Sequence, residues 1–368
     1  MEAPARGPRH PAEAVPISPA SDSPPAGGVL VMGAGAIGCY LGGRLVHAGV
    51  DVHFVGRPRV LDALRAHGLG IAEADGDTVT IAPGRLSLHE RVPAGLGLAL
   101  VLLCVKSGAT DDAARELAAT LPAGTLVASM QNGLHNAEIA QRAAPALRVV
   151  AGMVPYNVAE IAPATWLRGS GGALALQDDP ATRAWLPAFE RAGLAAQLHA
   201  DMRAVQWAKL LLNLNNPVNA LSGLPLRAQL LDRDLRATTA ALMAEAVALL
   251  ARTHQPLARL TPVPPWMLPA LMRLPTPLFS RLAARMLKID PRARSSMADD
   301  LALGRPTEID ALCGEVVRLA DSMREHAPRN ERMVSLVRAA EHAAETRGSP
   351  ARRPTPGPEL RREIEAAG

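Results

Sequence analysis

The pattern of apolar positions changes abruptly at Gly28. Residues 1–27 are rich in Pro, Ala and Ser and contain no continuous apolar run, so they cannot bury enough apolar surface to fold and we expect disorder. After Gly28, short apolar runs alternate with segments whose apolar positions recur every three or four residues. The short runs are typical of buried strands and the longer period is typical of helices. The first half of the chain therefore predicts an α/β domain.

The predicted strands of this domain are short and mostly apolar. They are Val29–Met32, Val52–Val55, Gly70–Ala72, Val79–Ile81, Leu98–Val105, Thr125–Met130, Val149–Val154, Ala173–Gln177 and Ala195–His199. Helical segments lie between many of them, including one near Pro180–Ala192. Such alternation predicts a doubly wound, Rossmann-type parallel sheet.

From Met202 onward the pattern is helical almost throughout. Apolar positions are spaced three and four apart at 235–253 and 307–325, whereas the proline-rich segment 260–277 predicts an ordered extended stretch or several short helices. Residues 346–355 are polar and rich in Pro and Arg, and a short helix at Pro358–Ala366 either docks on the protein or stays free.

The domain organisation follows from these changes of pattern. We expect a disordered extension at 1–27, a dinucleotide-binding α/β domain at 28–200, an all-α domain at 201–345, and a tail with a short helix at 346–368. The catalytic and substrate-binding domain would be the helical one. No internal repeat is evident.

A glycine-rich motif, GAGAIG, follows the first predicted strand and opens a helix. In this context the glycines allow a tight turn, a close approach of the backbone to a pyrophosphate, and close packing of helix on strand. The residues expected to contact a dinucleotide are consecutive: Gly33, Ala34, Gly35, Ala36, Ile37 and Gly38. The alternative, a glycine-rich turn without a ligand, is weaker because both flanking elements are present.

The second strand ends in Val55-Gly56-Arg57. Sites for NAD place an acidic residue near this point to bind the ribose hydroxyl, and sites for NADP tend to supply an arginine. Because Arg57 follows the strand and no acid does, the sequence favours NADP(H). A solvated loop arginine is the competing interpretation.

Two further strand ends carry polar side chains. Lys106 follows Leu98–Val105, and Asn132 follows Thr125–Met130. Ligands of open α/β sheets bind outside the carboxyl ends of the strands, so these residues, the glycine motif and Arg57 are expected to converge. Alone, Lys106 would be a solvated lysine and Asn132-Gly133 a plain turn.

The stretch VQWAKLLLNLNNPVN, at Val205–Asn219, places a lysine in an apolar helical pattern. Lys209, Asn213 and Asn216 are spaced to share one helix face. Pro217 should break or kink the helix, which would leave carbonyls and amides to form a polar pocket. Helix termination alone also explains asparagines here, and the spacing does not separate the two interpretations.

Segments RSSM and RPTEID complete the candidate site. Ser296 or Thr307 could be a helix N-cap, and Glu308 or Asp310 could complement a helix dipole. These structural roles are strong alternatives when the segments are considered alone.

Composition narrows the functional classes. The net charge is +4, and four Trp, two Tyr and three Phe are too few for base-stacking platforms, so we expect no nucleic-acid partner.

Neither a signal sequence nor a membrane span is evident. The three cysteines predict reduced, buried thiols rather than disulfides or a metal site, and hence a cytoplasmic protein. The only lysines are Lys106, Lys209 and Lys288, and a lysine in a cleft can give up its proton whereas arginine cannot.

Taken together, GAGAIG, CVKS, QNG, WAKLLLN with the following NNPVNAL, and RSSM followed by RPTEID resemble the ketopantoate reductase (2-dehydropantoate 2-reductase) family over about residues 29–325. The resemblance implies an N-terminal Rossmann domain, a helical C-terminal domain and a cleft between them. It implies NADPH-dependent reduction of ketopantoate to pantoate, on the way to coenzyme A. The partner would be a small 2-oxo acid, and the protein a monomer or homodimer.

The resemblance also implies roles for individual residues. Lys209 would be the general acid, with Glu308 as the second catalytic residue. Substrate would be bound by Lys106, Asn132, Asn213, Asn216 and Ser296, and Lys106, Asn132 and Glu308 would also lie beside the cofactor. A neighbouring carboxylate is expected to keep Lys209 charged.

One departure from the family pattern concerns the second asparagine. The family's Asn-Pro pair is here Asn216-Pro217, one position closer to the lysine, so Asn215 or Asn219 could replace Asn216. The shift indicates a divergent branch. It leaves open a reductase of another 2-oxo acid, and a non-catalytic NADP(H) sensor remains the alternative from a different class.

Overall fold

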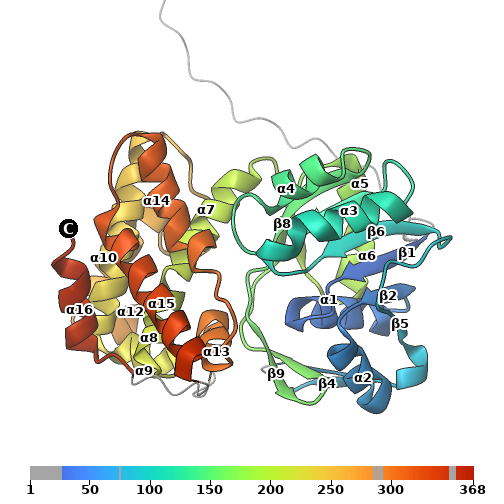
Figure 1. Ribbon diagram of the computed structural model, residues 1–368, viewed down its shortest axis with the longest axis horizontal. Coiled ribbons are helices and arrows are strands. Elements are labelled where there is room, and N and C mark those ends of the chain that lie inside the picture. Colours follow the sequence, from blue (N-terminus) through green and yellow to red (C-terminus); the bar gives the residue numbers. More distant parts are fainter. Residues whose placement is uncertain (1–26, 74–75, 285–286, 288–292, 348–353) are drawn as a thin grey trace, which may run out of the picture.

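The computed structural model describes residues 27–73, 76–284, 287, 293–347 and 354–368. The extension predicted to be disordered lies outside this part except for Gly27, and so does most of 346–355. Figure 1 shows two lobes, an α/β lobe in blue and green and a helical lobe in yellow to red.

The α/β lobe is built on a sheet with the strand order β5-β2-β1-β6-β7-β8-β11-β12. The strands are β1 (Gly28–Met32), β2 (Val52–Val55), β5 (Ser87–His89), β6 (Leu98–Leu103), β7 (Leu126–Ser129), β8 (Arg148–Met153), β11 (Leu174–Gln177) and β12 (Ala196–His199). All neighbours pair in parallel except β8 and β11. The predicted Rossmann-type sheet is therefore confirmed.

Helices cover both faces of this sheet. They are α1 (Ala36–His47), α2 (Pro58–His67), α3 (Thr110–Thr120), α4 (Asn136–Ala143), α5 (Pro180–Arg183) and α6 (Leu186–Arg191). Leu41 of α1 packs in one apolar cluster with Phe54, and Leu117 of α3 packs in another with Val101. Alternate strand residues supply the two clusters, which explains why the strands are apolar on both sides.

A second sheet extends the lobe, with the order β4-β3-β10-β9. Its strands are β3 (Leu69–Glu73), β4 (Thr78–Ile81), β9 (Val158–Ala162) and β10 (Thr165–Arg168). The first two match predicted strands. Strands β5, β9 and β10 were not predicted. Strand β9 is largely exposed and β5 is only half-buried, so neither of these two carries a buried apolar run. The single helix expected near 180–192 is divided into α5 and α6, with a proline near the start of each.

The helical lobe begins at α7 (Met202–Asn213). It continues with α8 (Asn215–Ser222), α9 (Leu226–Leu231), α10 (Arg233–Arg252), η3 (Pro265–Met267), α11 (Leu268–Arg273), α12 (Thr276–Leu282), α13 (Ser296–Ala302), η4 (Ile309–Ala311), α14 (Cys313–Ser322), α15 (Pro328–Arg347) and α16 (Gly357–Glu365). The segment 260–277 thus forms short helices, one of the two predicted outcomes. The helix predicted at 307–325 starts later, after the single 3-10 turn η4.

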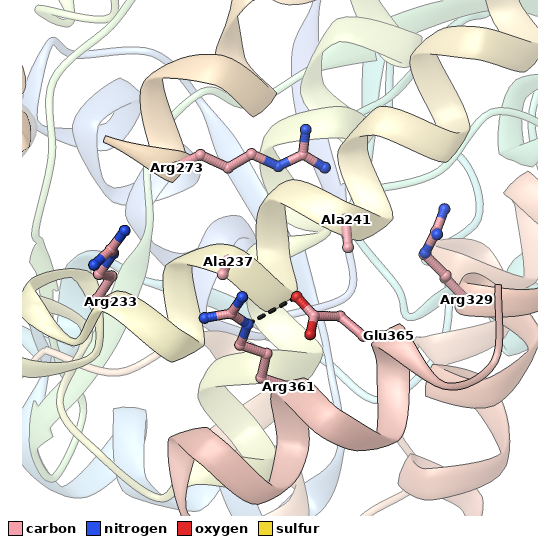
Figure 2. Close-up of a pocket in the computed structure, with 7 residues that line it drawn as sticks. All are labelled: Arg233, Ala237, Ala241, Arg273, Arg329, Arg361 and Glu365. Carbon is pink, nitrogen blue, oxygen red and sulfur yellow. Dashed lines mark hydrogen bonds and ion pairs between the residues drawn. The ribbon is translucent and has the colours of Figure 1, made fainter. Parts of the chain in front are cut away.

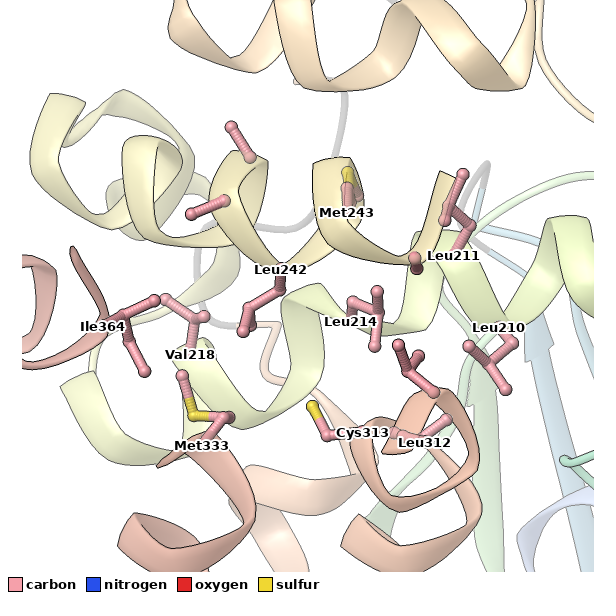
Figure 3. Packing of buried hydrophobic residues seen from close by; sticks show 14 of the residues in the cluster. Leu210, Leu211, Leu214, Val218, Leu242, Met243, Leu312, Cys313, Met333 and Ile364 are labelled. Carbon is pink, nitrogen blue, oxygen red and sulfur yellow. The ribbon is translucent and has the colours of Figure 1, made fainter. Parts of the chain in front are cut away.

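One apolar cluster fills the helical lobe (Figure 3). Leu214 and Val218, from the α7–α8 region, pack with Leu242 of α10 and Met333 of α15. The terminal helix α16 contributes Ile364, which is fully buried. This helix therefore docks on the lobe, which decides between the two alternatives left open by the sequence.

The helix α7 connects the lobes. Its first turns supply Met202 and Val205 to a small cluster with Met153 and Ala175 of the sheet, and its later leucines belong to the core of the helical lobe. No helix in the described part of the chain combines the length and apolar character needed to cross a membrane.

Candidate functional site

The glycine motif forms the turn between β1 and α1. Gly33 has φ +111°, and a Cβ there would lie 2.7 Å from the backbone nitrogen of Val105, so only glycine fits. A Cβ at Gly38 would collide with Gly33 and Val31, whereas a Cβ at Gly35 would meet nothing within 4 Å. Gly38 thus permits close helix–strand packing, and Gly35 borders open space in front of the helix N-terminus. The helix has no acid in its first turn, so the loop fits an anionic pyrophosphate.

Arg57 lies directly after β2, which pairs with β1, and it is the N-cap residue of α2. Its side chain is exposed, and the described residues offer it no ion-pair partner. An unpaired cation at this strand end is compatible with both interpretations of Arg57. It could contact the 2′-phosphate of NADP, or it could be a solvated loop arginine.

The ends of β6 and β7 lie side by side because these strands are neighbours in the sheet. Lys106 follows β6, and its Nζ lies 2.6 Å from Oδ1 of Asp300 in α13 of the other lobe. Asn132 follows β7, and its Nδ2 donates to Oε2 of Glu308 at 3.4 Å. The convergence predicted for these strand ends is present, and each side chain is paired across the lobe junction.

A hydrogen-bond network supports these strand ends. Ser107 Oγ donates to Oε1 of Glu308 at 3.1 Å. Asn136 donates to the Asn132 carbonyl oxygen at 2.5 Å and to Ser107 Oγ at 3.1 Å. Thr110 Oγ1 donates to Asn136 Oδ1 at 2.9 Å. Ser107 and Asn136 were not singled out from sequence, although Ser107 stands next to Lys106 in the CVKS motif.

Lys209 lies in the last part of α7, at the junction of the lobes. Its Nζ donates to the backbone oxygen of Pro155 at 3.0 Å. Burial lowers the pKa of Lys209 to about 8, because removal from water disfavours the charged form. An amine with this pKa can both hold and release a proton near neutral pH.

The carboxylate expected beside Lys209 is not there. Glu308 accepts from Ser107 and Asn132 instead, and no ion pair of Lys209 is found among the described residues. Without a negative partner, desolvation acts unopposed, which is why the pKa falls rather than rises.

A small pocket surrounds Lys209 and contains residues of both lobes. Its lining residues are Gln131, Asn132, Gly133, Met153, Gln206, Lys209, Leu210, Asn213 and Leu312. The structure thus brings Lys209, Asn132 and Asn213 together. The free space is about 10 Å³, roughly the room one water molecule needs, so a substrate does not fit the pocket in this conformation.

The break predicted near Pro217 lies at Leu214, where α7 ends and α8 begins. Pro217 occupies the first turn of α8, where a missing N–H costs no helical hydrogen bond. Leu214 keeps helical dihedral angles and its nitrogen still donates to Leu210. The proline therefore lies in the first turn of a new helix that follows α7 directly.

The three asparagines of α8 have different environments. Asn215 exchanges two hydrogen bonds with buried Gln229, at 2.7 and 3.3 Å. Asn219 is fully buried and bonds to the backbone of Leu224 and Ser295. The Asn216 side chain has no hydrogen-bond partner among the described residues, but it is not part of the lining around Lys209. Of the three, Asn216 is the one whose side-chain amide makes no hydrogen bond within the described ranges.

Ser296 is exposed at the first position of α13, and the N-cap of that helix is Ser295, whose Oγ accepts from Ala298 N at 3.2 Å. Ser296 thus has no capping role. It precedes Asp300 by four residues, so the two share the helix face that reaches Lys106.

Comparison with known proteins agrees with this arrangement. Residues 29–180 match the family described as "Ketopantoate reductase PanE/ApbA", and residues 201–341 match "Ketopantoate reductase PanE/ApbA C terminal". The chain belongs to the ketopantoate reductase family. It is therefore a member of an oxidoreductase family that uses a nicotinamide dinucleotide.

Individual relatives span nearly the whole chain. A 2-dehydropantoate 2-reductase from Mesorhizobium japonicum is 30% identical over 340 residues, covering 84% of this chain and 96% of the relative. The crystal structure of a PanE/ApbA family ketopantoate reductase from Ralstonia eutropha has a TM-score of 0.73 at 29% identity, with 86% and 99% covered. A D-mandelate dehydrogenase solved with NADH and anilino(oxo)acetate shares the fold, with a TM-score of 0.69 at 19% identity and coverages of 86% and 99%.

Proposed function

We propose that the protein reduces 2-dehydropantoate (ketopantoate) to pantoate with NADPH, as a cytoplasmic enzyme of pantothenate and coenzyme A biosynthesis. The observation that carries this proposal is Lys209, an amine whose pKa is lowered to about 8 by burial and which shares a pocket with Asn132 and Asn213 where the two lobes meet. Membership of the family and the names of the relatives support the same reaction.

The mechanism follows from the charge that develops during reduction. A nicotinamide dinucleotide, held by the glycine loop between β1 and α1, would supply a hydride for the 2-oxo carbon when bound. Negative charge then builds on the carbonyl oxygen, where the Lys209 ammonium stabilises it and donates its proton. Asn132 and Asn213 would orient the substrate, since both have amide groups on the lining beside Lys209. Lys106, Ser296 and Asn216 would bind its carboxylate and hydroxyl.

Glu308 has a positioning role in this proposal. It binds Ser107 and Asn132 across the lobe junction, so it fixes the amide of Asn132 relative to substrate and cofactor. It would contact both when the cleft is occupied, and as an acceptor it suits a substrate hydroxyl.

Substitution of Lys209 tests the proposed acid. Lys209→Ala should lower kcat by about a hundredfold or more, the range for a lost general acid, while NADPH binding survives. Lys209→Arg is the matched control: it keeps the charge but cannot release a proton near neutral pH, so it should be nearly as inactive. A non-catalytic NADP(H) sensor predicts that both variants behave like the wild type.

A second candidate substrate is another 2-oxo acid, which the one-position shift of Asn216-Pro217 favours. NADPH consumption with ketopantoate and a panel of simple 2-oxo acids separates the two. If ketopantoate is turned over no better than the simple acids, the named substrate is wrong while the reaction class stands.

The preference for NADPH rests on Arg57. Arg57→Ala should weaken the binding of NADPH by about tenfold or more, as expected for a lost charged contact. It should change the binding of NADH little. Titration of each cofactor by fluorescence measures this. Arg59→Ala, an equally exposed neighbour in the first turn of α2, is the control. Equal losses for both cofactors would contradict a role at the 2′-phosphate.

A further inference from the structure

A hollow of about 310 Å³ lies between α10, α11, α15 and α16. These helices include α16, which is at the end of the helical lobe away from the sheet (Figure 1). The lining consists mostly of arginines: Arg233, Arg273, Arg329 and Arg361, with Ala237, Ala241 and Glu365. Figure 2 shows the arginines around the methyl groups of Ala237 and Ala241. The hollow is distinct from the cleft at Lys209.

The charges around this hollow are not balanced. Arg361 is neutralised, because it pairs with Glu365 at 2.8 Å and with Asp234 at 3.0 Å. Arg329 donates to the terminal oxygen of Gly368, the last residue of the sequence, at 3.1 Å. Arg233 and Arg273 have no hydrogen-bond or ion-pair partner within the described ranges. Arg233 and Arg273 therefore border the recess without a carboxylate partner in the described part of the chain, an arrangement that attracts anions.

The wall that bears Arg273 is held in place by a buried arginine. Arg236 is fully buried and donates to the carbonyl oxygens of Met272 at 3.2 Å and Leu274 at 2.9 Å, on either side of Arg273. Its guanidinium also stacks on Phe279. Arg233 lies one turn earlier on the same helix, so the backbones that carry Arg233 and Arg273 are fixed relative to each other.

The opposite walls are also attached to α10. Glu245 accepts from the backbone nitrogens of Arg329 at 3.2 Å and Asn330 at 2.9 Å, which fixes the start of α15. The Asp234 contact fixes Arg361 and hence α16. A recess whose walls are all tied to one helix loses little freedom when a ligand binds.

We propose that this hollow binds a small organic molecule that carries a phosphate or diphosphate group. The planar guanidinium fork matches phosphate oxygens in a bidentate manner, and several arginines suit more than one negative charge. The volume is at the lower end of small-molecule sites, and the two alanine methyls offer a short apolar floor. Because the cations surround a recess, a free molecule fits them better than a flat lipid surface.

Calorimetric titration of the full chain with inorganic pyrophosphate tests the site. Excess NADPH is present to fill the glycine loop, and ionic strength is held constant without phosphate buffer. We expect saturable binding that Arg233→Gln/Arg273→Gln weakens by about tenfold or more per arginine, the value of a charged hydrogen bond. Arg281→Gln is the matched control, because Arg281 is exposed in the last turn of α12 and does not line the hollow.

Each result decides the proposal. Loss of binding in the double variant with retention in Arg281→Gln supports it. The proposal is overturned if the wild type does not bind pyrophosphate, or if the wild type, the double variant and Arg281→Gln bind it equally. It is also overturned if Arg281→Gln weakens binding as much as the double variant does. Sedimentation with vesicles of phosphatidylcholine and phosphatidic acid completes the test, since binding to vesicles without binding of pyrophosphate would mean a lipid surface and contradict a free ligand. Kcat with saturating substrate shows whether the double variant is folded.

Discussion

At the scale of single residues, the surroundings of Lys209 differ from the sequence prediction in one chemical respect. An amine next to a carboxylate would have a raised pKa, whereas the Lys209 amine donates a hydrogen bond to the carbonyl oxygen of Pro155 and its pKa is lowered to about 8. The sequence shows the lysine and its amides on one helix face but not which groups from the other lobe pack against them. Glu308, the carboxylate expected there, is bound by Ser107 and Asn132 instead.

The lowered pKa leads to a prediction for the pH dependence of reduction. Lys209 must be protonated to act as an acid, and it is protonated below its pKa. The kcat/KM for the 2-oxo acid should therefore be constant below about pH 7 and fall tenfold per pH unit above about 8. A substrate carboxylate would stabilise the ammonium, so the fall in kcat should begin at a higher pH. A flat kcat/KM profile up to pH 10 would contradict the assignment, and Lys209→Ala should lack this limb.

At the scale of elements, the sequence pattern was most successful for helices and strands whose buried positions recur regularly. The parallel strands are apolar on both faces, so their runs mark them out, as at Val52–Val55. Strand β9 is exposed on nearly every residue and exists because it pairs with β10, which is a tertiary cause with no local signal. The start of α8 is an intermediate case: Pro217 predicted a break, but the break lies at Leu214, and the hydrogen bonds of Asn215 and Asn219 have no signal in the sequence.

The hydrogen bonds of the asparagines in α8 predict different effects when each asparagine is replaced. Asn215→Ala leaves the buried amide of Gln229 unpaired, and Asn219→Ala leaves the Ser295 nitrogen and Leu224 oxygen unpaired. Each should lower the free energy of unfolding by about 1–3 kcal/mol. Asn216→Ala should change stability by less than about 0.5 kcal/mol while lowering kcat/KM. Urea unfolding and steady-state kinetics measure both quantities. The opposite pattern, with Asn216→Ala unstable but active, would transfer the substrate role to another asparagine.

At the scale of the whole molecule, the cleft is closed by contacts between lobes. Lys106 pairs with Asp300, and His135 Nε2 lies 2.8 Å from Oε1 of Glu315. Together with the bonds to Glu308 they leave about 10 Å³ beside Lys209. A 2-oxo acid does not fit that space, so we expect its turnover to require the lobes to separate and close again, a motion typical of enzymes that exclude water from the reaction.

A disulfide across the junction would test this requirement. A Cβ at Gly133 would lie 3.6 Å from the Cβ of Ala311 in the other lobe, within the range that disulfides need. Gly133→Cys/Ala311→Cys should therefore form a bond on oxidation and hold the cleft closed. Gly133 has φ +94°, so the substitution itself costs some stability, and activity must be compared between the oxidised and reduced forms of the same variant.

The oxidised double variant should lose about tenfold or more in kcat/KM, because substrate then enters only the open fraction. Its activity should recover on reduction. Each single cysteine variant should be insensitive to oxidation, which controls for the native thiols. Full activity of the stapled protein would mean that substrate reaches Lys209 without separation of the lobes.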